Sequence, residues 1–301
     1  MTTIQDLTRY ITDKTHFVSL QEYKDFACAF LDFVDKGLHT VIKCENEWDY
    51  DFFQYREDCR YNVSRPINCK LFGNIASFEG QLEKFDFVMG EIASKKKPAK
   101  EYRDIFRSTI YTLQQSIGAA LDALPASSAN QAKKINGDLF ERLVRLLMKQ
   151  VRVDCKAGVL QIPVKDEDGT AMTTEVFQHD LIGRKNGKVV FIGSVKTSSK
   201  DRIDKIFVDK LMFSRLSDYN VPYIAVFLND VQRAKGTAIN KFKVNSTFLS
   251  GHFKAYTLGL SPIDGVYYCD LRPNMMTDAF LSRHIFGIDR LFFDELKPYV
   301  K

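Results

Sequence analysis

An aspartate and a lysine on two successive apolar runs form the first candidate for a reactive group in this chain. The run "KVVFIGSVK" ends in Lys196, and the run before it, "TTEVFQHDLIG", contains Asp180. Side chains on a strand alternate between its two faces, so Ser194 and Lys196 point the same way. An aspartate binds a divalent cation, which polarises a phosphate and lowers the pKa of a bound water, while a lysine neutralises developing charge. The pattern therefore predicts metal-dependent phosphodiester chemistry, with Mg²⁺ as the cofactor.

The turn between the two runs decides whether Asp180 reaches Lys196. The segment "RKNGK" between them has the composition of a hairpin turn. A two-residue turn at Asn186 and Gly187 puts Asp180 on the face opposite to Lys196. A three-residue loop over residues 185–187, or a bulge elsewhere in the hairpin, shifts the register by one residue and brings the two side chains together.

Two helical segments supply further acids, which are needed because a single carboxylate is a weak site for Mg²⁺. Asp209 is the first candidate, since it shares one helix face with Arg202 and Lys205 at spacings i, i+3 and i+7. Glu141, inside the amphipathic segment 136–151, is the second candidate, as an outer carboxylate or the ligand of a second metal ion. Each of them also fits an ordinary charge on an amphipathic helix.

Lys200, Asp201 and Arg202 form a charged triplet at the start of the second of these helices. Lysine and arginine donate hydrogen bonds to guanine O6 and N7, and aspartate accepts one from cytosine N4. The triplet is therefore a candidate for recognising consecutive G·C pairs in double-stranded DNA. The alternative is an ordinary helix start, where the macrodipole favours an acid. The short offset from Lys196 favours DNA recognition.

The pattern of apolar residues divides the 301-residue chain into two regions. Residues 1–130 have mostly helical spacing and end in a Pro-, Ser- and Asn-rich linker. Residues 131–301 alternate between strand-like and helix-like runs. A helix between the strand-like runs 188–196 and 222–228 makes a strand–helix–strand crossover. The prediction is an α/β core behind a helical N-terminal region.

The composition limits the class of protein. Basic residues exceed acidic ones by five, which is compatible with nucleic acid without demanding it. The six cysteines lack the C-x-x-C spacing of a zinc site and are expected to be reduced thiols. The N-terminus lacks the apolar core of a signal peptide, and no run of about 18 apolar residues occurs. A cytoplasmic protein is therefore expected.

The order Ser194-x-Lys196, then Lys200-Asp201-Arg202, then Asp209, resembles the CCGG family of type II restriction endonucleases, which includes EcoRII-like and NgoMIV-like enzymes. The resemblance implies a variant PD-(D/E)xK fold, a mixed central sheet flanked by helices. One carboxylate is displaced to the helix after the lysine strand, which leaves Ser194 two residues before the lysine. The resemblance implies metal binding by Asp180, Asp209 and Glu141, and base recognition by Lys200, Asp201 and Arg202. The catalytic residues that it implies are Asp180, Lys196, Asp209, Glu141 and Ser194.

Two positions depart from the family pattern. His179 stands where a proline is expected, and Asp209 stands where a glutamate is more usual. Because aspartate is one methylene shorter, Asp204 is kept as the alternative ligand. The resemblance covers roughly residues 135–230 and leaves the first 125 residues unmatched.

These observations predict a prokaryotic, Mg²⁺-dependent restriction endonuclease of a restriction–modification system. It is expected to be a homodimer, with a tetramer as the alternative, that cuts both strands of a palindromic site with a CC/GG core (CCGG or CCNGG) and leaves 5′-phosphate ends. Residues 1–130 are expected to contact flanking DNA or to support dimerisation, and residues 131–301 to form the nuclease core. The alternatives are a repair or junction-resolving nuclease of the same fold, and an inactive DNA-binding protein.

Overall fold

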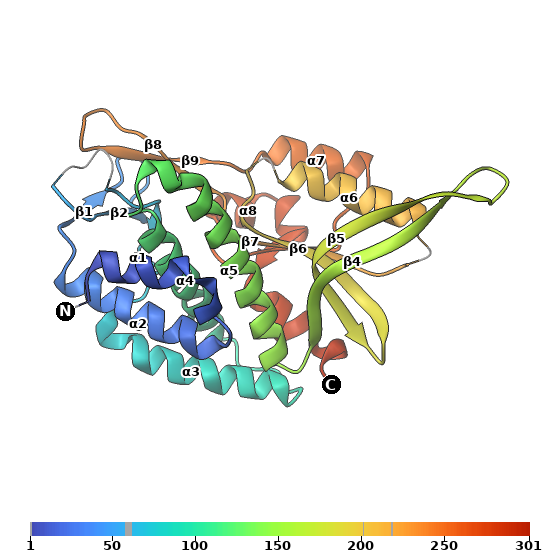
Figure 1. Cartoon of the computed structure of the whole chain (residues 1–301), viewed down its shortest axis with the longest axis horizontal. Helices are drawn as coiled ribbons and strands as arrows, with labels where there is room; N and C mark the ends of the chain where they lie inside the picture. Colours follow the sequence, from blue (N-terminus) through green and yellow to red (C-terminus); the bar gives the residue numbers. More distant parts are fainter. Residues whose placement is uncertain (1, 58–61, 201, 218) are drawn as a thin grey trace.

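The computed structural model describes residues 2–57, 62–200, 202–217 and 219–301 (Figure 1). The helices are α1 (Ile4–Thr12), α2 (Leu20–Lys36), α3 (Ile75–Ala93), α4 (Tyr102–Leu121), α5 (Ala129–Gln150), α6 (Ile203–Leu216), α7 (Ser250–Gly259), α8 (Pro273–Thr277) and α9 (Ile288–Arg290). The strands are β1 (Thr40–Lys43), β2 (Tyr50–Gln54), β3 (Ile67–Asn68), β4 (Asp154–Lys165), β5 (Ala171–Lys185), β6 (Lys188–Ser198), β7 (Tyr223–Asn229), β8 (Val231–Lys235), β9 (Phe242–Ser246), β10 (Gly265–Tyr268) and β11 (Ile285–Gly287).

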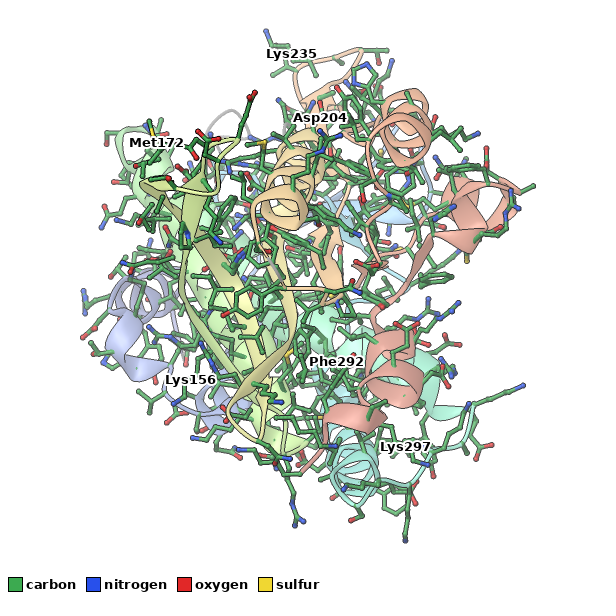
Figure 2. The ribbon with its side chains drawn as sticks, turned by 90° about the vertical axis from the view of Figure 1, so that its right-hand side faces the viewer. Lys156, Met172, Asp204, Lys235, Phe292 and Lys297 are labelled. Carbon is green, nitrogen blue, oxygen red and sulfur yellow. The ribbon has the colours of Figure 1, made fainter. Side chains whose placement is uncertain are left out.

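The main sheet is mixed, and within the described residues its strands follow the order β11-β10-β7-β6-β5-β4. Strands β4, β5 and β6 form an antiparallel meander, whereas β6, β7, β10 and β11 run parallel. The long β4–β5 hairpin projects from one end of the molecule, and Figure 2 views that end with Met172 near the hairpin tip and Asp204 on α6. Helix α6 connects β6 to β7, which confirms the predicted crossover and the α/β class.

Different helices cover the two faces of the main sheet. The side chains of β6 alternate between the two faces and therefore contribute to two separate hydrophobic cores. Phe191 and Val195 lie in a core with residues of α4 and α5. Ile192 lies in a second core with Ile206 and Phe207 of α6. Strand β6, which carries Lys196, is therefore held between α5 on one face and α6 on the other.

Helix α5 begins earlier than the sequence predicts, at Ala129 instead of residue 136. Ala132 and Ile135 extend its buried face by another turn ahead of Leu139. Asn136 is buried as well, and its side-chain oxygen accepts a hydrogen bond from Gln114 Nε2 (2.9 Å). Asn136, which the pattern placed at the start of the helix, is therefore a buried and hydrogen-bonded residue inside it.

Helices α1, α2 and α4 of the N-terminal region pack on α5, which in turn packs on β4 and β6. One hydrophobic core therefore contains residues from both sides of residue 130, among them Phe30, Ile117 and Leu139. This region also contains a small sheet of order β1-β2-β3, which the periodicity did not indicate. The β8–β9 ribbon packs on it through Val231 and Val244.

A buried carboxylate links the small sheet to the main one. Asp270, directly after β10, accepts hydrogen bonds from Tyr50 Oη (2.8 Å) and Asn68 Nδ2 (2.8 Å). Burial is the main cause that raises the pKa of Asp270 to about 6. This acid therefore contributes less to stability once it is ionised.

The described cysteines Cys28, Cys44, Cys69, Cys155 and Cys269 are free thiols. Among the residues that the structure describes, no helix combines the length and the apolar character needed to cross a bilayer.

Candidate active site

The hairpin between β5 and β6 has a two-residue turn, and a bulge then corrects its register. Lys185 pairs with Lys188 across Asn186 and Gly187, whose φ angles of 53° and 78° suit a tight hairpin turn. Between the next two pairs, β6 contributes one extra residue, Val190. The structure thus combines the short turn with a bulge, the second of the two routes that bring Asp180 and Lys196 to one side.

A second bulge lies at Asp180 itself. Lys156 of β4 pairs with Ile182, but Gly158 pairs with His179, so Asp180 and Leu181 together oppose a single residue of β4. Bulges re-aim side chains and are frequent beside active sites. Here the bulge turns the carboxylate of Asp180 toward the end of β6.

Lys196 lies between two carboxylates. Its Nζ is 2.6 Å from Oδ2 of Asp180 and 3.2 Å from Oε1 of Glu141 on α5. The main-chain N–H of Val195 donates to the same Oδ2 of Asp180 (2.8 Å). Three elements therefore converge at this point: the bulge of β5, the end of β6 and the middle of α5. The structure thus brings Asp180, Lys196 and Glu141, three of the predicted site residues, into one group.

The carboxylate pair leaves oxygen atoms open for a cation. Burial first, and then the charge of Asp180, raise the pKa of Glu141, while Lys196 acts in the opposite direction. Within the described chain, Oδ1 of Asp180 and Oε2 of Glu141 accept no hydrogen bond. Two carboxylates with free oxygens are the donors that a hard divalent cation takes, so the residues present fit Mg²⁺.

Arg145 is a member of this group that the sequence analysis missed. It lies one turn after Glu141 on α5, and its Nη1 donates to the main-chain carbonyl of Asp180 (3.2 Å). The signal was available in the i, i+4 spacing of Glu141 and Arg145. The contact fixes the main chain at the bulge from the α5 side.

Asp209 does not join the other two acids. Both of its carboxylate oxygens accept hydrogen bonds from Lys205 (2.8 and 2.6 Å), one turn earlier on α6. Over the described residues, no three His, Cys, Asp or Glu side chains lie close enough together to hold a metal ion. Oδ2 of Asp204, the alternative metal ligand, lies 3.8 Å from Nδ1 of His252. The assignment of a third ligand stays a prediction.

Ser194 occupies the position, two residues before the lysine, from which the acid is displaced in the family pattern. It is buried, and its Oγ lies 3.1 Å from Oη of Tyr223 on β7. His179 is buried beside them, at ring-centroid distances of 5.3 Å from Phe213 and 5.7 Å from Tyr223. Burial lowers the pKa of His179 to about 4, so the ring is neutral near pH 7. These residues pack the base of the site against α6.

The charged triplet lies where β6 leads into α6. Lys200 Nζ donates to Oε1 of Gln232 on β8 (3.0 Å), a partner that the sequence did not reveal. Arg202 is exposed at the start of α6, and its guanidinium has no hydrogen bond or ion pair to any residue described. Asp201, the third member, lies outside the described residues. Both described members are thus at the surface beyond Lys196.

The mixed central sheet with flanking helices agrees with the predicted restriction-endonuclease-like PD-(D/E)xK fold, and a solved structure supports that assignment. The chain is similar to the type IIP restriction endonuclease Kpn2I, with a TM-score of 0.69 and 14% sequence identity over 97% of this chain and 95% of that one. A structure of the restriction endonuclease PspGI with its substrate DNA matches at a TM-score of 0.41 and 11% identity, over 74% of this chain and 92% of the other. A score of that size does not by itself establish a shared fold. No protein-family model and no curated protein matches the chain.

Proposed function

We propose that this protein is a type II restriction endonuclease that cuts both strands of a palindromic DNA site in the presence of Mg²⁺. The observation that carries the proposal is the position of Lys196, within 2.6 Å of Asp180 and 3.2 Å of Glu141 at a bulged strand. The fold, which resembles that of Kpn2I over nearly its whole length, supports it. An inactive DNA-binding relative has no need to keep both acids and the lysine.

The side chains divide the work of phosphodiester hydrolysis. Asp180 and Glu141 would hold Mg²⁺, which when bound supplies positive charge at the phosphate and a more acidic water. The ammonium group of Lys196 faces the same phosphate and stabilises the charge that develops there. The N–H of Val195 and the guanidinium of Arg145 hold Asp180 in place, so the carboxylate needs little reorganisation when the reaction begins.

The triplet supports a specificity for a CC/GG core. Lys200 and Arg202 lie at the surface beyond the catalytic lysine, and their side chains are suited to donate to guanine in the major groove. In a symmetric homodimer, or in a tetramer built from such dimers, two copies would address the two halves of a palindrome of CCGG or CCNGG type. A water that attacks the phosphorus from the side opposite the 3′ oxygen would break the P–O3′ bond, leaving a 3′-hydroxyl on one end and a 5′-phosphate on the other.

Digestion of plasmid DNA tests the proposal. The wild-type protein with Mg²⁺ should give discrete, reproducible bands, and Asp180→Asn should give none under the same conditions. A smear instead of bands would favour a nonspecific nuclease of this fold. Absence of cleavage with retained DNA binding would favour a regulator.

A further inference from the structure

A basic groove lies at the C-terminal end of α5, next to the group formed by Asp180, Lys196 and Glu141. It has a volume of about 790 Å³ and lies between the C-terminal half of α5 and the start of β4. Its charged lining consists of six cations and one acid: Arg142, Arg145, Lys149, Arg152, Lys156, Lys301 and Asp154. Such an excess of one sign in a concave surface attracts an anionic partner.

Three of the cations are free to bind one. Lys149, Arg152 and Lys156 are exposed, and none has a hydrogen bond or ion pair through its side chain to the part of the chain that the structure describes. The others have internal partners. Arg142 donates to main-chain carbonyls near the end of α1, and Lys301 pairs with Asp154 (3.0 Å).

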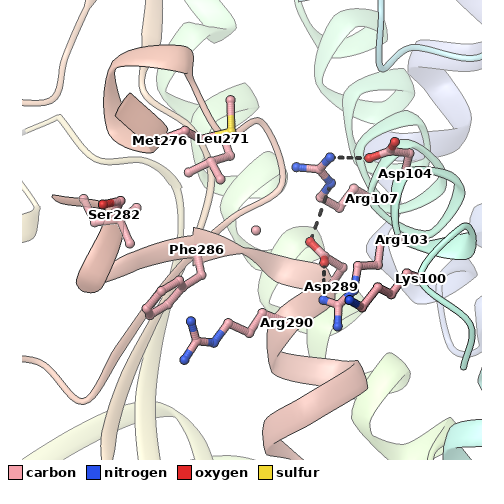
Figure 3. Close-up of a pocket in the computed structure, with 12 residues that line it drawn as sticks. Lys100, Arg103, Asp104, Arg107, Leu271, Met276, Ser282, Phe286, Asp289 and Arg290 are labelled. Carbon is pink, nitrogen blue, oxygen red and sulfur yellow. Dashed lines mark hydrogen bonds and ion pairs between the residues drawn. The ribbon is translucent and has the colours of Figure 1, made fainter. Parts of the chain in front are cut away.

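A second charged cavity shows what an internally neutralised cluster looks like (Figure 3). It measures about 510 Å³ and lies between α4 and β11. There Arg103 donates to Asp289 and Asp294, both at 2.6 Å, and Arg107 pairs with Asp104. Those cations hold the C-terminal segment to α4. Among the residues that the structure describes, Asp154 is the one acid that lines the basic groove beside α5.

The groove begins at the catalytic carboxylates. Glu141, Arg145 and Lys149 follow one another at intervals of four residues, so they lie along one face of α5. Arg145, the second of them, contacts the carbonyl of Asp180. A chain of phosphates that runs from Lys196 along this face of α5 would therefore bring neighbouring phosphates to Arg145 and Lys149.

The groove and the triplet lie on opposite sides of the catalytic group. Lys156, labelled in Figure 2, is on β4 at one edge of the main sheet. It pairs with Ile182, which in turn pairs with Ile192 of β6. Lys196 is four residues further along β6, and Lys200 is four residues beyond that. A DNA strand that passes Lys196 would have base-recognition residues on one side and the groove on the other.

We propose that Lys149, Arg152 and Lys156 bind the phosphate backbone of duplex DNA that flanks the scissile phosphate, on the side away from the triplet. The inference rests on the proposed endonuclease function and assigns to the groove a sequence-independent contact. Each phosphate that a cation neutralises releases counterions, so the logarithm of the binding constant falls with the logarithm of the salt concentration by about 0.9 per contact.

The test is the salt dependence of duplex binding, measured by fluorescence anisotropy with a labelled duplex of about 30 base pairs without divalent cations. The variant Lys149→Gln, Arg152→Gln, Lys156→Gln should lower the slope by roughly 2 to 3, close to three lost contacts. It should weaken binding to unrelated sequences by the same factor. The control is Lys84→Gln: Lys84 is an exposed lysine on α3 whose side chain has no hydrogen bond or ion pair to any residue described, so this variant should keep the wild-type slope.

The outcomes separate this inference from the proposed function. The charge-preserving variant Lys149→Arg, Arg152→Lys, Lys156→Arg should retain the wild-type slope, which excludes a folding defect as the cause. A neutralised variant with the slope of the Lys84→Gln control, in a protein that still cuts DNA, would overturn the inference and leave the endonuclease proposal intact. A wild-type protein that neither binds nor cuts duplex DNA would overturn both.

Discussion

Replacement of Lys196 by alanine tests the assembled group most sharply. The lysine is the one cation that contacts both carboxylates among the described residues, at 2.6 Å from Asp180 and 3.2 Å from Glu141. It does not contact a base in the proposed arrangement, since it faces the scissile phosphate. The substitution should therefore remove catalysis and leave site-specific binding largely intact.

The size of each effect follows from the surroundings of Lys196. Loss of one group that stabilises transition-state charge costs on the order of 10²–10³ in rate. The Lys196 side chain is 30% exposed, so water screens the two carboxylates that remain, and the expected loss of folding free energy is only about 1 kcal/mol. The variant should thus stay folded. The pKa of Glu141 in it should rise further, because the neighbouring cation that lowers this pKa is lost.

Single-turnover cleavage with excess enzyme separates the two effects. The rate for Lys196→Ala should fall by about 10²–10³-fold or more, while the dissociation constant, measured with Ca²⁺ in place of Mg²⁺, should change by less than about tenfold. Lys84→Ala is the control for loss of a surface lysine. A cleavage rate near that of the wild type would refute the role assigned to Lys196.

The other expectations concern the third ligand, the triplet, the cation and the buried acid. Asp209→Asn should lose Mg²⁺-supported cleavage in steady-state assays and Asp204→Asn should lose little; the reverse ranking would make Asp204 the ligand. Arg202→Ala should reduce the preference for cognate DNA over DNA altered in its G·C core by about 1–3 kcal/mol per half-site in competition binding, whereas an equal loss on both DNAs would show a backbone contact. The pKa of Glu141 is raised, and its carboxyl must lose a proton before it binds Mg²⁺. The Mg²⁺ affinity measured by calorimetry should therefore increase as the pH passes that pKa, and this pH dependence should be weaker in Glu141→Gln. Asp270 has a pKa of about 6 in the folded protein, against a usual value of 3.8. The folded protein should therefore lose roughly 3 kcal/mol of unfolding free energy as the pH rises from about 4 to about 6. In denaturation experiments, Asp270→Asn should not show this loss.

Local patterns were sufficient to predict the elements that hold the site. The apolar periods of α5, β5, β6, α6 and β7 are each visible in the sequence, and their order along the chain determines the crossover. The small N-terminal sheet was not predicted because β2, Tyr50–Gln54, is buried on both faces and therefore lacks alternation. Its Asp51 is buried beside Lys43 (2.7 Å), a pairing that no local pattern reveals.

The arrangement of the site was predictable only in part. Asp180, Lys196 and Glu141 could be named because each has a chemically distinctive position on its element. The bulges that bring them together depend on pairing with β4 and β6, and hydrogen bonding between strands is not encoded in the period of one strand. For the same reason Gln232, on β8 and far along the chain, could not be foreseen as the partner of Lys200.

Sequencing of cleaved ends from a pool of duplexes with a randomised central segment, incubated with Mg²⁺, tests the central claim most directly. The proposed function predicts that the cut sites share one palindrome with a CC/GG core and that their ends are 5′-phosphorylated and ligatable. It further predicts that the pool stays intact when Asp180→Asn replaces the wild-type protein. Ends distributed without a common sequence, or cleavage that persists in Asp180→Asn, would contradict the claim.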